Sequence, residues 1–594
     1  MTSSSDKDGG ADGSRTFDVV IMGGGPAGST LAAILARKSP HLKIGIFEKE
    51  FFPREHIGES FSHRVTAVLE ESGALGKVLA SDCYVKKYGG YYAWDEVPAA
   101  TLFDPRSFER DGVERWSIHV NRSEFDSILL DHARACGVEV QEGVTVARVT
   151  REGSLSRVEF SDGEFVSTKI FVEASGRQTT VVTGAPKAYL SQYKNIAIWN
   201  HVLYGKSAQS LPGTWNIFRE GDRSSIANFA FEDGWFWYIP VPKIVLGERK
   251  VTHSIGMVTD PQVLKDPAKR YTDPARFMKK AREVPLLRDL IAEAQPIADK
   301  VLTATNYSMI SERFCSFDEG WMLIGDAAYF VDPLFSSGVA FAMMHADAAA
   351  AVIRWTLEGS VGSDLTREVW DDYDRGWQTI ARSFALSIDQ WYHAIAVNNP
   401  TSVYWQVRAK ASLFDPSHRP FQELVDTGIA PDLLRVLTRG TDQIADLGTD
   451  GPLVEALDAI AKGAPKAGAR IAMHPDVAIR ESLTVDPVRG KGAQSFDPRV
   501  PVDEAAARYW ADPVRYGADV PAMYGDPRRC QRFFFKSRPG AREVRFEDTV
   551  HAGRALFARL SAGAPTLAEL DPELNDGQRK LLRQMIQAGM VVAA

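Results

Sequence analysis

The stretch FDVVIMGGGPAGSTLAAILARKS, residues 17–39, decides the fold. Its first six residues have the apolar pattern of a buried strand, and a glycine turn and a helix-forming segment follow directly. In the Gly-x-Gly-x-x-Gly motif, glycines allow a tight turn and the close approach of a pyrophosphate. The start of the new helix adds free N–H groups and a positive dipole end. We therefore expect a Rossmann-like α/β domain whose dinucleotide contacts Gly23, Gly25, Pro26, Ala27 and Gly28.

The next apolar stretch, KIGIFEKE at residues 43–50, supports this interpretation. Its Glu48 follows Gly28 by 20 residues, the usual distance to the carboxylate that holds the ribose hydroxyls. A glycine turn without a ligand is the alternative, but it does not explain the strand, the helix and Glu48 together. The motif itself does not separate FAD from NAD.

The composition is that of a globular protein. The chain has 594 residues, of which 44% are hydrophobic and 25% charged, enough for about two to four domains. The net charge of −8, from 69 basic and 77 acidic side chains, excludes a global basic field of the kind that binds nucleic acid. No apolar run is long enough to predict a membrane span, and no pattern predicts a metal site.

Two further features bear on the location of the protein. The four cysteines form no Cys-x-x-Cys pair, which favours a reduced, cytoplasmic environment over a disulfide scaffold. Residues 1–16 are polar and lack the apolar core of a secretion signal, so we expect a disordered tail there.

Three later segments decide the cofactor. They predict an arginine-bearing turn with a helix and a strand, then a strand ending in Ala-Ser-Gly-Arg, then a strand ending in Gly-Asp. The segments are VNRSEFDSILLDHARACGVEV (120–140), KIFVEASGRQT (169–179) and EGWMLIGDAAYFVDP (319–333). Their order resembles the FAD-dependent monooxygenase superfamily with the p-hydroxybenzoate hydroxylase fold, over residues 17–395.

This resemblance implies roles and an architecture. Asp326 matches the carboxylate that holds a ribityl hydroxyl of FAD, and Arg122 matches the arginine near the FAD phosphates. The implied fold class is α/β (α+β), with the Rossmann-like FAD-binding domain interleaved with an antiparallel substrate-side sheet. That sheet is expected at roughly 84–120 and 190–310.

Two motifs in the first part of the chain are candidates for the site. In FFPREHIGES, residues 51–60, Arg54, Ile57 and Ser60 follow the second strand and are expected near FAD. A surface Arg54, and Ser60 as the N-cap of the next helix, are the alternatives. In YVKKYGGYYAWD, residues 84–95, two lysines precede an aromatic strand. Such lysines are usually solvated, whereas one buried among aromatic rings becomes a hydrogen-bond donor or, if its pKa falls, a nucleophile.

A third motif, EDGWFWYIPVP at residues 232–242, contains Trp-x-Trp-x-Ile-Pro. Alternation places Trp235 and Trp237 on one face of a strand, where sheet packing alone is the simpler interpretation. Together the three motifs resemble the flavin-dependent halogenases, and most of all those of the chloramphenicol and chondrochloren pathways, which carry Pro-Leu-Phe-Ser. Tryptophan halogenases have a glutamate where this chain has Phe335, which argues against free tryptophan as the substrate.

The halogenase resemblance implies a mechanism. In the family, reduced FAD and O₂ give a C4a-hydroperoxide, halide attacks it, and hypohalous acid passes through a tunnel to a lysine. That lysine is Lys87 by its spacing from the following glycine, or Lys86 if the register is shifted by one residue. Ser336 matches the serine partnered with the lysine. The two tryptophans and Phe335 would keep the substrate away from the flavin.

The halide site can be argued from the residues themselves. Hydrated chloride is a poor nucleophile, so a site must replace its water with fixed donors. Residues 336–338 begin a helix expected to reach about residue 356, and the free N–H groups and dipole at a helix start favour an anion. The amides of Ser337 and Gly338 are therefore the halide candidates, and N-capping by Ser336 or Ser337 is a compatible alternative.

The predicted function follows from these residues. Only one Gly-x-Gly-x-x-Gly follows a strand, so no second Rossmann domain for NAD(P)H is evident, a feature that single-component hydroxylases of the superfamily share. The halogenase resemblance implies that a separate flavin reductase supplies FADH₂. The chain is then an FADH₂- and O₂-dependent halogenase of natural-product biosynthesis that uses chloride or bromide on a phenolic, other electron-rich or carrier-protein-tethered substrate. An FAD monooxygenase acting as a hydroxylase, and a non-enzymatic flavin-binding relative, are the alternatives that Lys87, Ser336 and the tryptophans disfavour.

The pattern changes after residue 395. Residues 396–594 are expected to form a mainly helical C-terminal domain, as a cap over the substrate tunnel or a docking surface for a carrier protein. Residues 540–594 resemble a winged helix, a module that often binds DNA. Their 7 basic and 7 acidic side chains argue against DNA.

Overall fold

The structure, a computed structural model, describes most of the chain. The described residues are 15–94, 99–102, 116–177, 181–182, 185–190, 194–210, 224–305, 308–358, 363–399, 401–411, 470–484, 528–536, 544–546, 552–587 and 590–593. The chain divides into two compact units, Met1–Ser360 with Trp377–Ala430 and Val361–Gly376 with Pro431–Ala594. The predicted tail lies outside the described residues except for Arg15 and Thr16, which begin the first strand.

The first unit contains a largely parallel sheet. β1 (Arg15–Met22) lies between β2 (Ile44–Glu48) and β10 (Phe165–Glu173) and runs parallel to both, in the order β19-β20-β10-β1-β2-β7. The apolar part of β1 is buried, as expected for a central parallel strand covered on both faces. The remaining strands are β7 (Glu139–Glu142), β8 (Val146–Glu152), β9 (Leu155–Phe160), β19 (Cys315–Ser316) and β20 (Trp321–Leu323).

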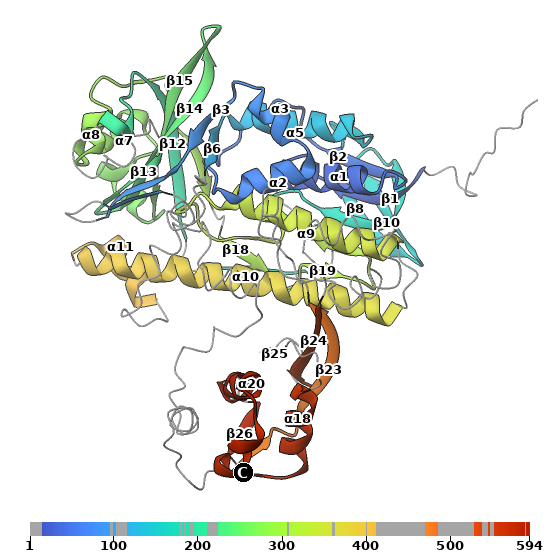
Figure 1. Ribbon diagram of the computed structural model, residues 1–594. Coiled ribbons are helices and arrows are strands. Elements are labelled where there is room, and N and C mark those ends of the chain that lie inside the picture. The colour runs from blue at the N-terminus through green and yellow to red at the C-terminus, as the bar shows by residue number, and fades with distance from the viewer. Residues whose placement is uncertain are drawn as a thin grey trace, which may run out of the picture. The chain divides into compact units, whose positions relative to one another are not determined.

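Helices cover this sheet, and small side chains let two of them approach closely. α1 (Pro26–Lys38) packs against α9 (Gly338–Glu358), whose buried face is rich in alanine. Figure 1 shows these two helices with α2 and α5 alongside the strands. The strand, glycine turn, helix and strand expected from the sequence are confirmed. The other helices here are α2 (Arg64–Ser72), α3 (Leu75–Leu79) and α5 (Arg122–Ala135), with a 3-10 turn η5 at Gly325–Ala327.

The segment before α2 differs from the expectation. The helix begins at Arg64, so Ser60 is not its N-cap. Residues 59–61 instead pair with β6 (Ser117–Val120), through Val120 N–H to Glu59 O at 2.7 Å and Phe61 N–H to Ile118 O at 3.1 Å. The extended backbone of this segment is satisfied by a strand that lies about 60 residues away in sequence, which no local pattern indicates.

A second sheet in this unit is largely antiparallel. Its order is β16-β12-β15-β14-β13-β4-β5, with β17 paired to β12, and among its described strands only β13 and β4 run parallel. The long hairpin of β14 and β15 stands at the top of Figure 1. The strands are β4 (Gly89–Ala93), β5 (Ala99–Leu102), β12 (Ile196–Leu203), β13 (Ile226–Phe231), β14 (Gly234–Val245), β15 (Glu248–Thr259), β16 (Gln295–Pro296) and β17 (Leu302–Thr305).

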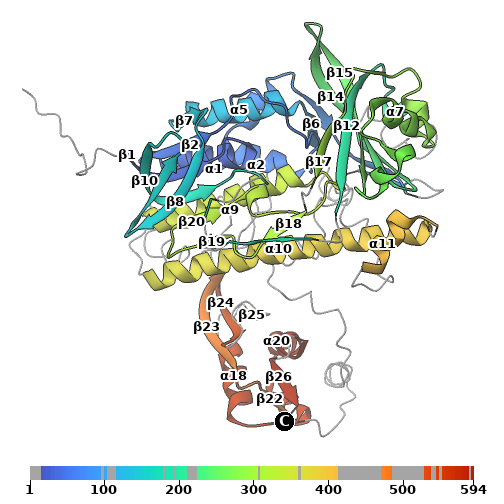
Figure 2. The same cartoon turned by 180° about the vertical axis from the view of Figure 1, so that it is seen from behind.

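Alternation gives this sheet two different faces. Phe236 and Tyr238 belong to an apolar core that includes side chains of α7 (Pro274–Glu283) and α8 (Leu287–Leu290). Figure 2 shows α7 beside the strands. Trp235 and Trp237 are out of phase with that core by one residue and lie on the opposite face, as the alternation predicts. We call this opposite side the tryptophan face.

Smaller elements complete the first unit. β3 (Tyr84–Lys87) pairs with β6, and β11 (Lys187–Tyr189), β18 (Met309–Ser311) and β21 (Tyr329–Phe330) form a small sheet. α10 (Ser363–Asn398), which belongs to this unit from Trp377 on, and α11 (Val403–Ala411) follow α9. The domain boundary expected at residues 395/396 therefore falls inside α10.

The described part of the second unit combines short strands and helices around its own apolar core, which includes Leu556, Leu581 and Val591. Over 540–594 a helix, a short helix and a further helix follow one another, and the apolar end forms a strand. A winged helix and a docking role stay predictions. The elements are β22 (Ile471–Met473), β23 (Val477–Thr484), β24 (Arg528–Phe535), β25 (Val544–Phe546), α18 (Ala552–Ala562), α19 (Leu567–Leu570), α20 (Asp576–Gln587) and β26 (Val591–Ala593).

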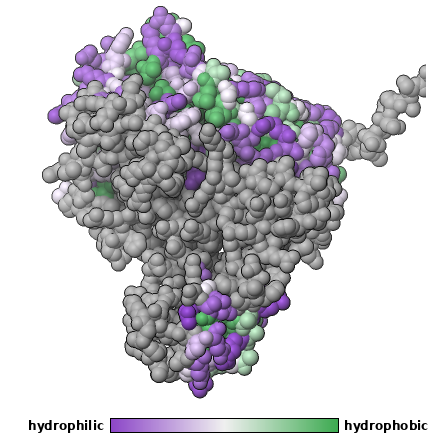
Figure 3. Space-filling view, in the orientation of Figure 1, coloured by the Kyte–Doolittle hydropathy of each residue, from purple (hydrophilic) through white to green (hydrophobic). Residues whose placement is uncertain are grey.

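The surface over the described residues is mixed. On the face in Figure 3, hydrophilic side chains alternate with scattered hydrophobic ones. No described helix is long and apolar enough to cross a membrane. A search of the same residues finds no group of three or more His, Cys, Asp or Glu side chains that could hold a metal ion.

One carboxyl group in the first unit is buried without a partner. Asp347 on α9 is 1% exposed, and neither oxygen has a hydrogen-bond partner among the described residues. Burial raises the pKa of Asp347 to about 7, and the smaller effects of Lys38 and Glu71 oppose each other. The pKa of Asp347 in the folded protein lies above its value in the unfolded chain. The stability that goes with the protonated carboxyl is therefore fully present below the unfolded pKa and is lost as the pH rises through the folded pKa of about 7.

We expect Asp347→Asn to be more stable than the wild type at pH 8.5. The gain should approach about 4 kcal/mol, which corresponds to the raised pKa, and it should shrink toward pH 5 because the wild-type carboxyl is then protonated. Urea unfolding of both proteins at the two pH values measures this. A difference in unfolding free energy that does not change with pH would contradict the assignment.

Candidate active site

The turn between β1 and α1 requires glycine at two positions. Gly23 has φ +107°, and a Cβ there would lie 2.5 Å from the carbonyl oxygen of Ala174. A Cβ on Gly28 would lie 2.0 Å from the carbonyl oxygen of Gly23. Gly25 is the N-cap of α1 and has no side chain that could accept a hydrogen bond. The N–H groups of the first turn therefore have no acceptor within the helix. The turn therefore offers backbone donors and a tight strand–helix contact.

These features fit a pyrophosphate. Pro26 and Ala27 form the start of α1 and are buried, which sets the helix end against the turn. One guanidinium nitrogen of Arg54 lies 3.5 Å from an ideal Cβ on Gly25, so this cation borders the same space. Arg54 is held there by Glu50 at 3.2 Å and by the ring of Phe52 at 4.7 Å. The space that a side chain would fill, the uncapped helix start and the cation suit the phosphates of FAD.

Arg122 is the first residue of α5 and is buried. Its guanidinium donates two hydrogen bonds to Asp126, at 2.8 and 2.9 Å, and two more to the carbonyl oxygens of Ile57 at 2.6 Å and Gly58 at 3.2 Å. An ideal Cβ on Gly58 would lie 3.7 Å from Val339, so Arg122 fixes this loop beside the start of α9. A direct contact between Arg122 and a phosphate stays a prediction.

Two carboxylates lie at the carboxyl ends of parallel strands, where such sheets bind ligands. Glu48 ends β2, is buried, and accepts from the N–H groups of Gly24 at 2.7 Å and Glu50 at 2.9 Å. Asp326 follows β20 in η5, and Arg177 Nε lies 3.9 Å from its carboxylate. Burial raises the pKa of Asp326, and Arg177 partly offsets this shift. The positions of both carboxylates fit the hydroxyl-binding roles expected for them.

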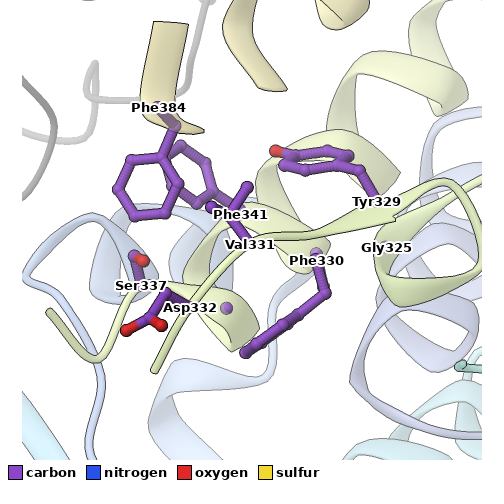
Figure 4. Close-up of a pocket in the computed structure, with 10 residues that line it drawn as sticks. Gly325, Tyr329, Phe330, Val331, Asp332, Ser337, Phe341 and Phe384 are labelled. Carbon is purple, nitrogen blue, oxygen red and sulfur yellow. The ribbon is translucent and has the colours of Figure 1, made fainter. Parts of the chain in front are cut away.

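A pocket lies at the start of α9 (Figure 4). It holds about 260 Å³ of empty space, part of it open to solvent. Ser337 lines it, is 1% exposed, and its hydroxyl has no hydrogen-bond partner among the described residues. The hydroxyl therefore does not cap the helix. The lining residues are Gly325, Tyr329, Phe330, Val331, Asp332, Ser337, Gly338, Phe341, Ala342 and Phe384.

The residues before α9 form a turn that directs side chains to different sides. Ser336 has φ +56°, a left-handed conformation that is uncommon outside glycine. The ring of Phe335 is buried and lies 6.4 Å from the ring of Tyr92 on the substrate-side sheet. The first hydrogen bond of α9 joins Phe341 N–H to Ser337 O at 2.8 Å, so the N–H groups that precede it have no acceptor within the helix. This arrangement fits an anion beside Ser337 and Gly338.

One lysine of the predicted pair is buried. Lys87 is 2% exposed, and its amine donates to the carbonyl oxygen of Phe61 at 2.9 Å. Burial lowers the pKa of Lys87 to about 7. Lys86 points the other way, is exposed, and places its amine 4.8 Å from the ring of Trp116. Burial therefore favours Lys87 over Lys86, and its pairing with Ser336 stays a prediction.

The tryptophan face carries a cluster of aromatic rings. The rings of Trp235 and Trp237 lie 6.1 Å apart, and Trp94 meets Trp235 edge-on at 6.4 Å. The indole N–H of Trp237 donates to the hydroxyl of Ser254 at 3.2 Å. Tyr92 lies 5.7 Å from Trp94 and joins this cluster to Phe335. The two predicted tryptophans and Phe335 thus belong to one aromatic wall.

A hydrogen-bond network that no sequence motif indicates lies behind this wall. Asp332 accepts from Asn195 at 3.2 Å, from the hydroxyl of Tyr392 at 3.1 Å and from the N–H of Leu334 at 3.0 Å. Trp235 in turn donates to Tyr392 at 3.1 Å. These donors engage the carboxylate that would otherwise oppose an anion in the pocket. Asp332 lies in the segment 319–333, but nothing in the sequence links it to Tyr392, which lies 60 residues later.

A second missed pair lies next to the lysine segment. Glu59 and His201 are both buried and lie 2.5 Å apart. The charge of His201 is the largest of the effects that lower the pKa of Glu59, and together they outweigh the opposing effect of burial. Glu59 lies in the Gly-Glu-Ser that ends the motif at residues 51–60, whereas no pattern in the sequence indicates His201.

Comparison with known proteins identifies similar chains. The tryptophan halogenase family matches residues 104–419. A tryptophan 2-halogenase of Chondromyces crocatus is 30% identical over 386 residues, which cover 64% of this chain and 68% of that protein. A 1H-pyrrole-2-carbonyl-(peptidyl-carrier protein) chlorinase of Pseudomonas fluorescens is 31% identical over 434 residues, which cover 68% and 87%.

Two solved structures share the fold. The myxobacterial chondrochloren halogenase CndH, a variant of FAD-dependent halogenases, is 26% identical with a TM-score of 0.56 and covers 69% of this chain and 89% of its own. The flavin-dependent halogenase CmlS is 19% identical with a TM-score of 0.63 and covers 97% and 95%. The likeness to CmlS extends into the C-terminal region, where it concerns the fold alone.

Proposed function

The chain belongs to the tryptophan halogenase family of flavin-dependent halogenases, and on this basis we propose that it halogenates a phenolic, other electron-rich or carrier-protein-tethered substrate through Lys87. The observation that carries the proposal is the buried amine of Lys87, whose pKa burial lowers to about 7. A separate flavin reductase would supply the reduced cofactor.

A flavin-dependent halogenase uses FADH₂, O₂ and a halide, here chloride or bromide, and bound FADH₂ with O₂ supplies the two-electron oxidation of the halide. We propose that the glycine turn and Arg54 hold the phosphates, and that the carboxylates of Glu48 and Asp326 hold hydroxyl groups of FAD. Arg122 supports the neighbouring loop at Ile57, and Ser60 lies two residues beyond Gly58 in the same segment. Ser337 and Gly338 present the halide.

Lys87 can act in either protonation state. With a pKa of about 7, both forms are populated near neutral pH. The neutral amine attacks the halogen of hypohalous acid, so an N–halogen bond forms, the halogen–oxygen bond breaks and water leaves with the amine proton. The ammonium instead donates a hydrogen bond to the same acid and orients it. In both cases the halogen would meet an amine that is buried away from bulk water.

The substrate class is supported by the aromatic wall. Trp235, Trp237 and Phe335 suit a flat or apolar group and would separate it from the flavin. One relative is named as a chlorinase of a carrier-bound pyrrole-2-carbonyl group, which supports including tethered substrates. Another is named a tryptophan 2-halogenase, and Phe335 is the reason to place free tryptophan behind the other classes.

A substrate panel tests this proposal. The protein with a flavin reductase, NADH, FAD, O₂ and chloride or bromide is offered simple phenols, free tryptophan, and a pyrrole-2-carbonyl group on a carrier protein. We expect halide-dependent mass gains with at least one of the first and third classes. Halogenation of free tryptophan alone would overturn the proposed substrate class, and hydroxylation without halide would overturn the proposed reaction.

The halide site gives a further prediction. Ser337→Ala removes a buried hydroxyl that has no partner among the described residues, while the backbone amides of the pocket remain. A hydrogen bond to a charged group contributes about 1.5–3 kcal/mol, so the KM for chloride should rise roughly tenfold or more. Steady-state rates at varied chloride measure this, with FAD absorbance as the control. An unchanged KM for chloride would place the halide elsewhere.

A further inference from the structure

We propose that Asn228 is a substrate-recognition residue. Its side-chain amide would form hydrogen bonds with a donor and an acceptor that lie side by side on the substrate. The proposal rests on the proposed function and deepens it. Asn228 lies on β13 and is 0% exposed. Neither its amide nitrogen nor its amide oxygen has a hydrogen-bond partner among the described residues. Buried amides are almost always hydrogen-bonded, so both unpaired atoms require an explanation.

The strand register places Asn228 on the tryptophan face. Asn228 pairs with Trp237 on β14 and with Tyr92 on β4, and residues paired in this way share a face. The neighbours of Asn228 along β13, Ala227 and Phe229, belong to the core on the other side of the sheet. The amide therefore stands between the two aromatic residues of the proposed substrate wall.

The two aromatic neighbours do not cover the amide with their own polar atoms. The indole ring of Trp237 lies over Gly256, where a Cβ would come within 2.0 Å of the ring. The indole N–H of Trp237 donates to the hydroxyl of Ser254 and is not available to the amide. Tyr92 folds back over Gly90, where a Cβ would lie 2.3 Å from the tyrosine hydroxyl. Both rings thus lie over glycines and flank the amide, and the glycines provide the room for this arrangement.

A second unpaired donor lies on the same face. The indole N–H of Trp94 has no hydrogen-bond partner among the described residues, although Trp94 is only 8% exposed. Its ring contacts both Tyr92 and Trp235. Unpaired polar groups among aromatic rings are typical of a pocket that orients a ligand through a few polar contacts.

The chemistry of the amide defines the ligand. A primary carboxamide presents an acceptor oxygen and donor N–H groups in one plane, so it matches a planar group whose N–H lies next to a carbonyl oxygen. Aromatic side chains on either side favour a flat ring. The substrate class is therefore an aromatic ring with a ring N–H beside an acyl carbonyl, and Asn228 would fix which ring carbon faces the halogen.

A ratio of specificities tests the proposal. The probes are 2-acetylpyrrole, which has the paired groups, and 2-ethylpyrrole, which lacks the carbonyl. For each protein the kcat/KM for the acetyl compound is divided by that for the ethyl compound, so that the intrinsic reactivity of the rings cancels between proteins. We expect this ratio to fall by roughly two- to tenfold in Asn228→Leu, because both probes keep the ring N–H and the ratio therefore reports the loss of the one hydrogen bond to the carbonyl.

A matched control separates recognition from packing. Asn200 in the same sheet donates to the carbonyl oxygen of Ala298 at 2.8 Å and accepts from His201 N–H at 2.8 Å. Asn200→Leu should lower the Tm and leave the ratio unchanged, whereas Asn228→Leu should keep or raise the Tm because it removes an unpaired amide. If Asn228→Leu does not fold, Asn228→Ala replaces it.

Binding gives a readout that does not require turnover. Trp237 lies next to Asn228, so binding of 2-acetylpyrrole can be followed by the quenching of tryptophan fluorescence. We expect the Kd for 2-acetylpyrrole to be at least about tenfold weaker in Asn228→Leu than in the wild type. This result would support Asn228 even if the protein fails to halogenate any substrate. An unchanged specificity ratio together with an unchanged Kd would overturn the proposal and leave a buried water as the partner of the amide.

Discussion

Replacing Lys87 with methionine is expected to reduce halogenation by at least about a thousandfold while FAD remains bound, because the variant has no amine to receive or orient the halogen. Lys87 is buried, and its amine donates to the carbonyl oxygen of Phe61, which lies outside the glycine turn. Product formation with reductase, O₂ and bromide measures the rate, and the flavin absorbance of the purified protein measures cofactor content.

A measurement of the stability of Lys87→Met separates loss of the amine from unfolding as the cause of lost halogenation. Burial lowers the pKa of Lys87 below its unfolded value, so the charged amine destabilises the fold below about pH 7, and this cost fades as the pH rises toward the unfolded value. Lys87→Met should therefore be more stable than the wild type at pH 6, by up to about 5 kcal/mol. A variant that is inactive and less stable at pH 6 would contradict this account.

The neighbouring lysine is the matched control. Lys86 is exposed and its amine lies over the ring of Trp116, so Lys86→Met removes the same charge from the same strand without touching the buried site. Its halogenation rate should stay within about twofold of the wild type. A loss confined to Lys86→Met would show that the register assigned to this strand is wrong.

Gly28→Val is expected to abolish FAD binding. A Cβ at this position would lie 2.0 Å from the carbonyl oxygen of Gly23 and 3.2 Å from Ile21, so α1 cannot keep its contact with β1. Overpacking of this size costs roughly 3 kcal/mol or more and displaces the helix start from the phosphates. The purified variant should lack flavin absorbance and have a lower Tm than the wild type.

Gly76 provides the control for this substitution. It lies in α3, and a Cβ there would meet nothing within 4 Å. Gly76→Ala should bind FAD normally and match or slightly exceed the wild-type Tm, since alanine is favoured over glycine in a helix. Normal flavin content in Gly28→Val would show that the turn does not hold the cofactor.

The sequence predicted the parts of the site whose chemistry is local. The glycine turn, the strand that ends at Glu48 and the shared face of Trp235 and Trp237 follow from spacing and alternation. The family and the FAD-dependent fold, expected from the same motifs, are confirmed. Burial of Lys87 rather than Lys86 was open in the sequence, because alternation gives two faces but not the one that is covered.

The parts that the sequence did not predict depend on long-range pairing. Ser60 as a helix cap was the alternative to a place near FAD, but its segment forms backbone hydrogen bonds with β6, and the helix starts only at Arg64. The contact between Asp332 and Tyr392 joins residues on different elements. Asn228 sits in an ordinary-looking strand, and only the register with β14 and β4 shows that its amide faces the aromatic wall.

The proposed role of Lys87, to deliver an oxidised halogen to the substrate, can be tested by a single-turnover product analysis. Protein with reduced FAD is mixed with oxygenated buffer that contains bromide and an electron-rich phenol, and the products are identified by mass spectrometry. We expect brominated phenol from the wild type and Lys86→Met, and none above background from Lys87→Met. Equal bromination by Lys87→Met, or a hydroxylated product that forms without bromide, would contradict it.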